Sequence, residues 1–370
     1  MQKQVTIIGG GPVGLSCALG LAKLGFNPTV IDSAQSKTND GRVLALSQGS
    51  DLVLKRLGVK LNQQITPIKQ IHISHSGLGI TKINASDLNL DKLGYTVPYT
   101  YVCEELEKQV TLNRNIKLLN ATVTTIKPDQ DLVHLKYTQN NQDYDFDSDL
   151  VIVAEGGRIK IDQIDYQEFD YKSMALIAKL DIENYQAGLA FERFDEKGAL
   201  VLLPHNGYYV LVWSLPTAVA TEIIDNNSLE DKLLEINFFK RFGKVTLKDK
   251  MHSFPLRLRV ATPKALKNLV LIGNSSQIVH PVAAQGLNLG LRDVTDLLDS
   301  FKYQSNHSNL FDNYQQKRKL DSKLTIGFTH FLANYLDRDY FTPLKSLGII
   351  ALSNCQSLQN KVANTLVFGI

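Results

Sequence analysis

The residues best suited to chemistry lie near the start of the chain, in a glycine-rich turn. Gly9, Gly11 and Gly14 satisfy the spacing G-x-G-x-x-G between a β-branched run, Val5 to Ile8, and an apolar pattern with helical period. Gly9 permits a tight turn, Gly11 lets a pyrophosphate approach the backbone, and Gly14 lets helix and strand pack closely. The turn therefore predicts a bound dinucleotide, and a purely structural turn without ligand is the alternative.

An acidic residue completes this pattern. Asp32 ends the strand that follows the first helical segment, about 20 residues after the turn, where dinucleotide-binding proteins place an acceptor for ribose hydroxyls. The glycine spacing alone is a weak signal. Together with the two strands, the helix and the acid, it strongly favours a nucleotide cofactor.

A second glycine-bearing segment occupies residues 269–293. A strand-like run leads into Gly273 and Asn274, and a helical pattern begins at Gln285. The free N–H groups and the dipole of such a helix stabilise negative charge, and Gly286 allows a flat ring to come close. A strand-to-helix turn without ligand is again the alternative, and His280 is interpreted as a turn residue rather than a general base.

Together the two segments resemble the FAD-dependent aromatic hydroxylases related to para-hydroxybenzoate hydroxylase, and among them the ubiquinone-biosynthesis hydroxylases. Residues 280–288 match that family's segment H-P-x-x-x-Q-G-x-N, and residues 41–47 resemble its arginine-bearing stretch. The resemblance implies FAD as cofactor, NAD(P)H as transient reductant, and catalytic roles for Pro281 and Gln285. It implies FAD contacts for Gly9, Gly11, Pro12, Val13, Gly14, Asp32, Arg42, Gly273, Asn274, Gly286, Leu287 and Asn288.

Three positions depart from the family pattern. Asn274 stands where the family usually has aspartate, Gln277 where it often has histidine, and Glu155 where it usually has aspartate. A neutral acceptor makes a weaker hydrogen bond to a ribitol hydroxyl than a carboxylate does. The family's arginine near the pyrophosphate also has no counterpart in residues 101–106, which carry acids instead. We therefore expect FAD to be held less tightly and its reduction to be impaired.

The elements that position these motifs follow from hydrophobic periodicity. The β-α-β opening and the apolar runs at 149–153 and 268–272 predict parallel strands, whereas residues 71–83, 132–144 and 174–213 alternate as antiparallel strands do. From Gln285 onward the pattern is helical. The predicted fold class is α/β, a Rossmann-like FAD-binding domain with a parallel sheet, plus a substrate domain with a mainly antiparallel sheet and C-terminal helices.

The order of these patterns predicts a domain that is discontinuous in sequence, because parallel-type strands return after the antiparallel stretch. The predicted FAD-binding domain comprises residues 1–70, 97–158 and 255–301. The predicted substrate domain comprises residues 71–96 and 159–254, and residues 302–370 form a C-terminal helical region.

Composition excludes several classes of protein. The chain has 370 residues, 44% of them hydrophobic, and 40 Lys and Arg against 37 Asp and Glu give a net charge of only +3. Such a balance offers no basic surface for nucleic acid. Three scattered cysteines predict neither a disulfide framework nor a metal site. No run approaches the roughly 18 apolar residues of a membrane span, so we expect a cytoplasmic protein, with peripheral contact at the inner face of the membrane left open.

These observations together predict an FAD-dependent monooxygenase that hydroxylates a phenolic ring, with a polyprenyl phenol of ubiquinone biosynthesis as the substrate that the resemblance implies. Two alternatives stay open. One is a catalytically degenerate subunit that serves assembly or lipid presentation in a biosynthetic complex. The other is a flavin- or NAD-linked dehydrogenase. A homo-oligomer and a biosynthetic complex are both compatible with the sequence.

Overall fold

A five-stranded parallel sheet grows from the strand that carries the glycine turn. In spatial order its strands are β19 (Leu269–Leu271), β12 (Leu150–Val153), β1 (Val5–Ile8), β2 (Thr29–Asp32) and β8 (Lys117–Asn120). All four pairings are parallel. The computed structural model describes residues 3–33, 41–75, 79–195, 198–280, 285–303 and 310–335, together with residues 364, 367 and 368.

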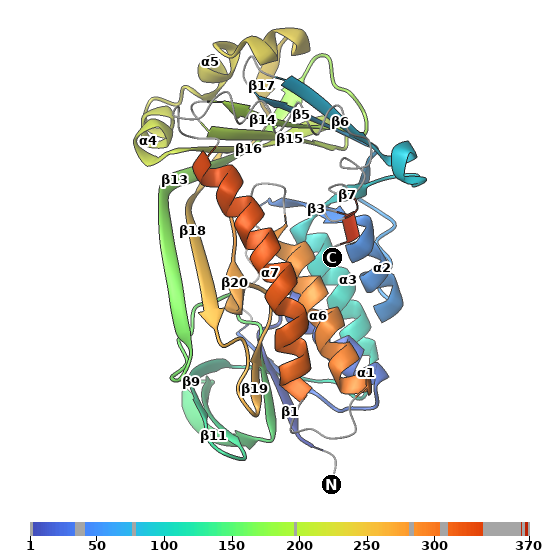
Figure 1. Cartoon of the computed structure of the whole chain (residues 1–370), viewed down its shortest axis with the longest axis vertical. Helices are drawn as coiled ribbons and strands as arrows, with labels where there is room; N and C mark the ends of the chain where they lie inside the picture. Colours follow the sequence, from blue (N-terminus) through green and yellow to red (C-terminus); the bar gives the residue numbers. More distant parts are fainter. Residues whose placement is uncertain are drawn as a thin grey trace.

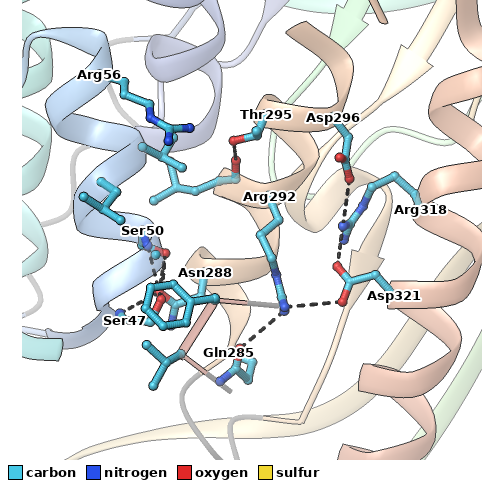
Figure 2. Close-up of a pocket in the computed structure, with 16 residues that line it drawn as sticks. Ser47, Ser50, Arg56, Gln285, Asn288, Arg292, Thr295, Asp296, Arg318 and Asp321 are labelled. Atoms are coloured by element: carbon cyan, nitrogen blue, oxygen red, sulfur yellow. Dashed lines mark hydrogen bonds and ion pairs between the residues drawn. The ribbon is translucent and has the colours of Figure 1, made fainter. Parts of the chain in front are cut away.

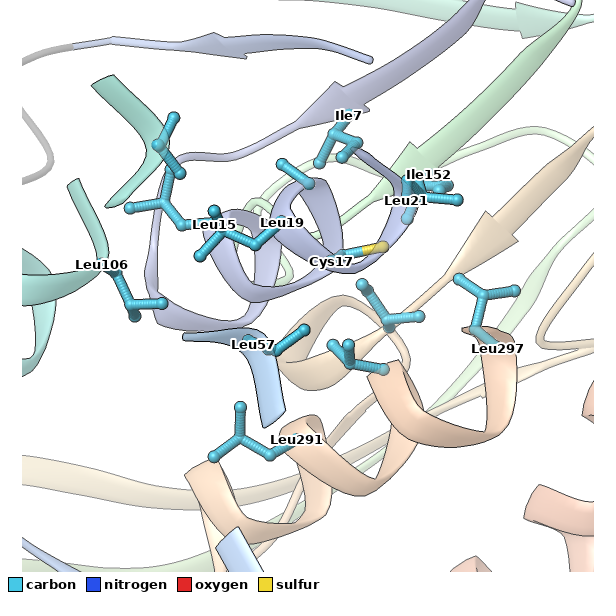
Figure 3. Close-up of a cluster of buried hydrophobic side chains, with 14 of the residues drawn as sticks. Ile7, Leu15, Cys17, Leu19, Leu21, Leu57, Leu106, Ile152, Leu291 and Leu297 are labelled. Atoms are coloured by element: carbon cyan, nitrogen blue, oxygen red, sulfur yellow. The ribbon is translucent and has the colours of Figure 1, made fainter. Parts of the chain in front are cut away.

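Both faces of this sheet are covered, which explains why its strands read as continuous apolar runs. Ile7 packs into a core formed with helices, whereas its neighbour Ile8 packs on the other face. Figure 3 shows the helical side, where Leu15 and Cys17 of the first helix belong to the same buried cluster as Leu291. The helices of this layer are α1 (Pro12–Lys23), α2 (Gln48–Leu57), α3 (Tyr99–Leu112) and α6 (Gly286–Tyr303).

The opposite face of the parallel sheet is closed by a small antiparallel sheet. Its strands, in spatial order, are β11 (Gln142–Ser148), β10 (Val133–Gln139) and β9 (Thr122–Pro128). Leu135 is buried against Val151 and Val153 of the parallel sheet.

A nine-stranded sheet forms the upper part of the molecule in Figure 1. Its strands are β20 (Gln277–Ile278), β18 (His252–Thr262), β13 (Asp165–Ile182), β16 (Tyr208–Pro216), β15 (Gly198–His205), β14 (Leu189–Asp195), β5 (Gln70–His75) and β6 (Gly79–Asn84), with β17 (Val245–Leu247) paired to β13. The long strands β13 and β18 run along the molecule and link this sheet to the parallel-sheet layer. Only the β14–β5 pairing is parallel among the strand pairs described in this sheet.

Short elements cover the outer side of the nine-stranded sheet and fill the junction. The outer core is built around Phe191, Phe239 and Phe242. Its covering elements are α4 (Thr217–Asp225), α5 (Leu229–Leu234) and the 3-10 helix η3 (Asn237–Phe242). The junction holds a three-stranded sheet of β3 (Val43–Ser47), β7 (Gly94–Pro98) and β4 (Thr66–Ile68), and the 3-10 helices η2 (Ala85–Leu88) and η4 (Gly273–Ser275).

A further helix, α7 (Leu310–Tyr335), packs along α6 (Figure 1). Tyr314 anchors it, because its hydroxyl donates to the Leu271 carbonyl at 3.0 Å. None of the helices in the described ranges is both long enough and apolar enough to cross a membrane. Residues 336–341, the end of the aromatic stretch that begins at Phe328, lie outside the described residues.

The predicted α/β fold class is confirmed, with a parallel sheet, antiparallel sheets and C-terminal helices. The predicted domain division stays a proposal. Its boundary between residues 254 and 255 falls inside β18, which pairs with β13 on both sides of that point.

Candidate cofactor and substrate site

A cavity of about 520 Å³ lies where the parallel-sheet layer meets the nine-stranded sheet. The glycine turn, the ends of β2 and β12, the start of β3 and the first residues of α6 line it on one side. Ile177, Leu203 and Val212, from three neighbouring strands of the nine-stranded sheet, line it on the other. The cavity therefore joins a polar, glycine-rich end to an apolar wall.

The glycines of the first turn differ in what surrounds them. A Cβ on Gly9 would lie 2.4 Å from the Ala154 carbonyl oxygen, and one on Gly14 would lie 2.0 Å from the Gly9 carbonyl oxygen. Gly9 also has a φ of +109°. A Cβ on Gly11 would meet only the Tyr99 hydroxyl, at 3.9 Å. Gly9 and Gly14 are thus needed for the turn itself, whereas Gly11 leaves open space above the backbone.

The start of α1 borders this open space. Gly11 is the N-cap, Pro12 is the first helical residue, and both line the cavity together with Val13. The first amides of a helix have no partners within the helix, so this end attracts anionic groups. Asp32 lies on the same side of the cavity, packed over Gly10.

Arg42 and Tyr99 form the next part of the lining. The Arg42 guanidinium lies 4.6 Å from the centre of the Tyr99 ring, a cation–π contact, and the Tyr99 amide donates to the Arg42 carbonyl at 2.9 Å. The sequence reasoning missed Tyr99. It follows Pro98 at the start of α3, and no local motif marks it.

Glu155 uses its carboxylate to shape the loop after β12. Its oxygens accept from the amides of Gly157 at 2.9 Å and Arg158 at 2.7 Å, and from the Ser275 hydroxyl at 3.1 Å. The side chain therefore fixes one wall of the cavity and connects it to η4. Arg158, which the sequence reasoning also missed, lines the cavity beside it.

The Gly273–Asn274 turn is held in place by Asp293 of α6. The Gly273 amide donates to Asp293 Oδ2 at 2.8 Å, and its positive φ of +60° suits glycine. Asp293 in turn contacts Arg318 Nε of α7 at 2.6 Å, and both side chains are fully buried. Gly273 faces Val13 rather than the cavity, whereas the exposed Asn274 lines it.

The start of α6 presents different residues to its two sides. Gly286 and Leu287 line the large cavity, and among the described residues no atom lies within 4 Å of a Cβ placed on Gly286. Gln285 and Asn288 instead line a separate cavity of about 280 Å³, shown in Figure 2. Pro281 lies outside the described residues.

Asn288 has a structural role at this point. Its Oδ1 accepts from the Ser47 amide at 3.0 Å and from the Ser50 hydroxyl at 2.6 Å, and its Nδ2 donates to the Ala45 carbonyl at 3.1 Å. Figure 2 shows Asn288 beside Ser47 and Ser50. The side chain therefore ties α6 to β3 and α2, and Asn288 is not among the residues that line the large cavity.

Burial keeps His280 neutral. Its side chain is 3% exposed, lies edge-on to the Tyr171 ring at 5.1 Å, and has its pKa lowered to about 4 by burial. Gln277, one of the departures from the family pattern, accepts from Lys264 Nζ at 2.8 Å. Burial lowers the pKa of Lys264 to about 8. His280, Gln277 and Lys264 are not among the residues that line the large cavity.

The family model for the FAD binding domain matches residues 2–329, and the chain belongs to this family. The 3-demethoxyubiquinol 3-hydroxylase of Escherichia coli is 27% identical over 97% of this chain and 96% of its own. The ubiquinone hydroxylase UbiL of Rhodospirillum rubrum is 26% identical over 90% of this chain and 82% of its own.

Solved structures share the fold. The p-nitrophenol 4-monooxygenase PnpA of Pseudomonas putida superimposes with a TM-score of 0.81, at 16% identity, over 100% of this chain and 98% of its own. The probable FAD-dependent monooxygenase pqsL of Pseudomonas aeruginosa gives 0.78 at 18% identity, over 95% and 100%. The predicted resemblance is confirmed, and FAD is the cofactor of this chain.

The residues present fit that cofactor. Gly11 and Gly286 both line this cavity, and the described residues leave space above each of them, so a ligand can approach the backbone at both points. The individual contacts predicted for the site residues stay predictions.

Proposed function

We propose that this chain is an FAD-dependent monooxygenase that hydroxylates the phenolic ring of a polyprenyl intermediate of ubiquinone biosynthesis, using NAD(P)H and O₂. The observation that carries the proposal is the cavity that runs from the glycine turn past the start of α6 to Ile177, Leu203 and Val212. The relatives named as ubiquinone-pathway hydroxylases support this choice of substrate.

In this proposal the polar end of the cavity holds the nucleotide half of FAD. The amides at the start of α1 face the pyrophosphate, Asp32 accepts from the ribose, and Arg42 supplies positive charge. Asn274 faces the ribitol, as a neutral acceptor. When bound and reduced, FAD supplies the oxygen-activating chemistry that the side chains of this protein cannot provide.

The start of α6 sets the electrostatics near the flavin. Gly286 and Leu287 bring helix amides to the cavity, and the positive end of an 18-residue helix favours negative charge there. Pro281 and Gln285 are proposed to position the phenol. Gln285 is buried and lies close to Arg292 Nη2, at 3.5 Å, so its orientation is fixed by α6.

The apolar wall excludes water from the reacting atoms. Ile177, Leu203 and Val212 offer no hydrogen-bonding side chain, which protects an activated oxygen species from wasteful breakdown. A polyprenyl substrate also resides in lipid, so we propose that the protein collects it at the inner face of the membrane.

The proposal is tested with the purified full-length chain. We expect a bound flavin, visible by its absorption, and NAD(P)H oxidation that a prenylated phenol in detergent accelerates. A flavin-containing protein that oxidises NAD(P)H at the same slow rate with and without several such phenols, and forms no product, contradicts the proposal and favours a degenerate subunit. Comparing NADH with NADPH identifies the reductant.

A further inference from the structure

A small, mainly apolar slot lies beside the proposed active site. It borders Gln285, the residue just before α6, and Asn288 in the first turn of α6. Its volume is about 100 Å³. Most of the side chains that line it are apolar, namely Ala45, Leu46, Ile68, Ile71, Ile73, Ile83, Leu93 and Val367, and Glu192, Ser47, Gln285 and Asn288 are its polar lining residues. Apart from Ala45, these apolar residues do not line the large cavity, so the proposed cofactor site does not account for them.

Strand register explains how the slot is built. Ile71 pairs with Ile83 across the antiparallel β5–β6 ladder, and Ile73 pairs with Glu192 across the parallel β5–β14 ladder. Directly paired residues point to the same face of a sheet, whereas His72, between the two isoleucines, and Ser74, after them, point to the other. One face of β5 therefore presents a row of isoleucines to the slot.

The walls of the slot differ in exposure. Ile83, Leu93 and Val367 are 7%, 3% and 6% exposed and form a packed floor. Ile71 and Ile73 are only half-buried, although they contact the same cluster. Two isoleucines thus keep part of their surface open within the described part of the chain, which leaves apolar area that a ligand can cover.

The slot adjoins the large cavity that holds the proposed active site. Ala45 borders both the slot and the large cavity. Gln285 borders the slot, and the next residue, Gly286, borders the large cavity. The slot and the cavity are therefore neighbours, and a chain attached to a ring at the start of α6 would have to pass Ala45 to reach the slot.

We propose that this slot binds the part of the isoprenoid chain that is attached directly to the phenol ring, and that Ile71 and Ile73 determine specificity for prenylated over unprenylated phenols. The inference rests on the proposed hydroxylase function. The slot is short, so the remainder of a long chain leaves the protein beyond β5 and β6. Burial of branched apolar carbon in an isoleucine-lined slot supplies the preference.

The test compares two phenols on the FAD-loaded protein by direct calorimetric binding. One carries a single isoprene unit and the other carries a methyl group in its place. We expect the parent to bind the isoprenyl phenol at least about tenfold more tightly. Ile73→Trp, which fills the slot, should abolish this preference and leave the methyl phenol and the FAD content unchanged.

A matched control lies on the same sheet. Ile80 is 57% exposed, pairs with Ser74 and does not border the slot, so Ile80→Trp should keep the preference. If Ile73→Trp does not fold, Ile73→Ala serves, and it should reduce the preference about threefold by removing one wall.

A folded, FAD-loaded Ile73→Trp protein that keeps the tenfold preference overturns the inference. So does a parent that binds both phenols equally well, and in that case the proposed hydroxylase function still stands. A parent that binds neither phenol removes both proposals.

Discussion

At the residue scale, the glycines of the first turn have separate duties. Gly9 and Gly14 leave no room for a Cβ against neighbouring backbone atoms, so substitution there disrupts the turn whether or not a ligand is present. Gly11 has an ordinary extended backbone, with φ of −73° and ψ of 176°, and open space above it. Among these three glycines, only Gly11 can therefore be substituted to test cofactor binding without disrupting the turn.

We predict that Gly11→Val folds normally and loses FAD. The valine side chain occupies the space proposed for the pyrophosphate without straining the backbone, and FAD content after purification should fall by at least about tenfold. Gly327→Val is a matched control, because no described atom lies within 4 Å of the Gly327 Cβ position, so valine has room there, and Gly327 lies in α7, away from the cavity. Equal FAD content in parent and Gly11→Val, with the same circular dichroism, contradicts the assignment.

His280 makes the stability of the protein depend on pH. Burial lowers its pKa from 6.5 to about 4, so the unfolded chain binds a proton between these values and the folded chain does not. The contribution of His280 to the free energy of unfolding is therefore fully present above pH 6.5. It decreases as the pH falls toward 4, by up to about 3 kcal/mol.

We predict that His280→Gln shows a shallower loss of unfolding free energy than the parent between pH 6.5 and 4.5. Urea unfolding at several pH values measures this directly. Identical pH dependence in the two proteins means that the imidazole is protonated in the folded state or is accessible to water.

At the element scale, the start of α6 separates the two proposed binding functions. Gly286 and Leu287 face the cofactor cavity, while Gln285 borders the apolar slot. The position of this helix is fixed by Asn288, which binds β3 and α2, and by the buried Arg318, which holds Asp293. These contacts set the distance between ring and helix amides.

We predict that Gly286→Leu lowers the hydroxylated product formed per NAD(P)H consumed by at least about tenfold, even where FAD remains bound. The leucine side chain enters space that no described residue occupies and is expected to displace the flavin from the helix amides. Gly286→Ala, which adds a single methyl group, should lose far less. If Gly286→Leu forms as much hydroxylated product per NAD(P)H as the parent, the flavin ring does not lie against the start of α6.

Local spacing made part of this site predictable. The glycine turn, Asp32 and the start of α6 each lie within one motif, so the sequence alone could identify them. Tyr99 and Arg158 could not be found in this way, because their position depends on contacts between distant elements. Asn288 belongs to a motif that the sequence identified, but the motif did not predict that its side chain would bind β3 and α2.

The same distinction applies to the sheets. Parallel strands such as β1 and β12 are recognisable as continuous apolar runs. The parallel pairing of β5 with β14 joins segments more than 100 residues apart and has no local signal. The apolar slot depends on that pairing, so only the structure reveals it.

At the scale of the whole molecule, the cavity lies where two sheets of different character meet. The parallel sheet and its helices provide glycine turns and helix amides, whereas the nine-stranded sheet provides an apolar wall. The strands β13 and β18 connect the two layers, so cofactor and substrate surfaces are held in one frame.

The central claim is that this chain inserts an atom of O₂ into a prenylated phenol. The most direct measurement supplies isotopically heavy oxygen gas to the FAD-loaded protein with NAD(P)H and a prenylated phenol, and determines the product mass. We expect a hydroxylated product that carries one heavy oxygen atom, formed by the parent protein and strongly reduced in Gly11→Val. Oxygen derived from water, or NAD(P)H consumption without any hydroxylated phenol, would contradict it.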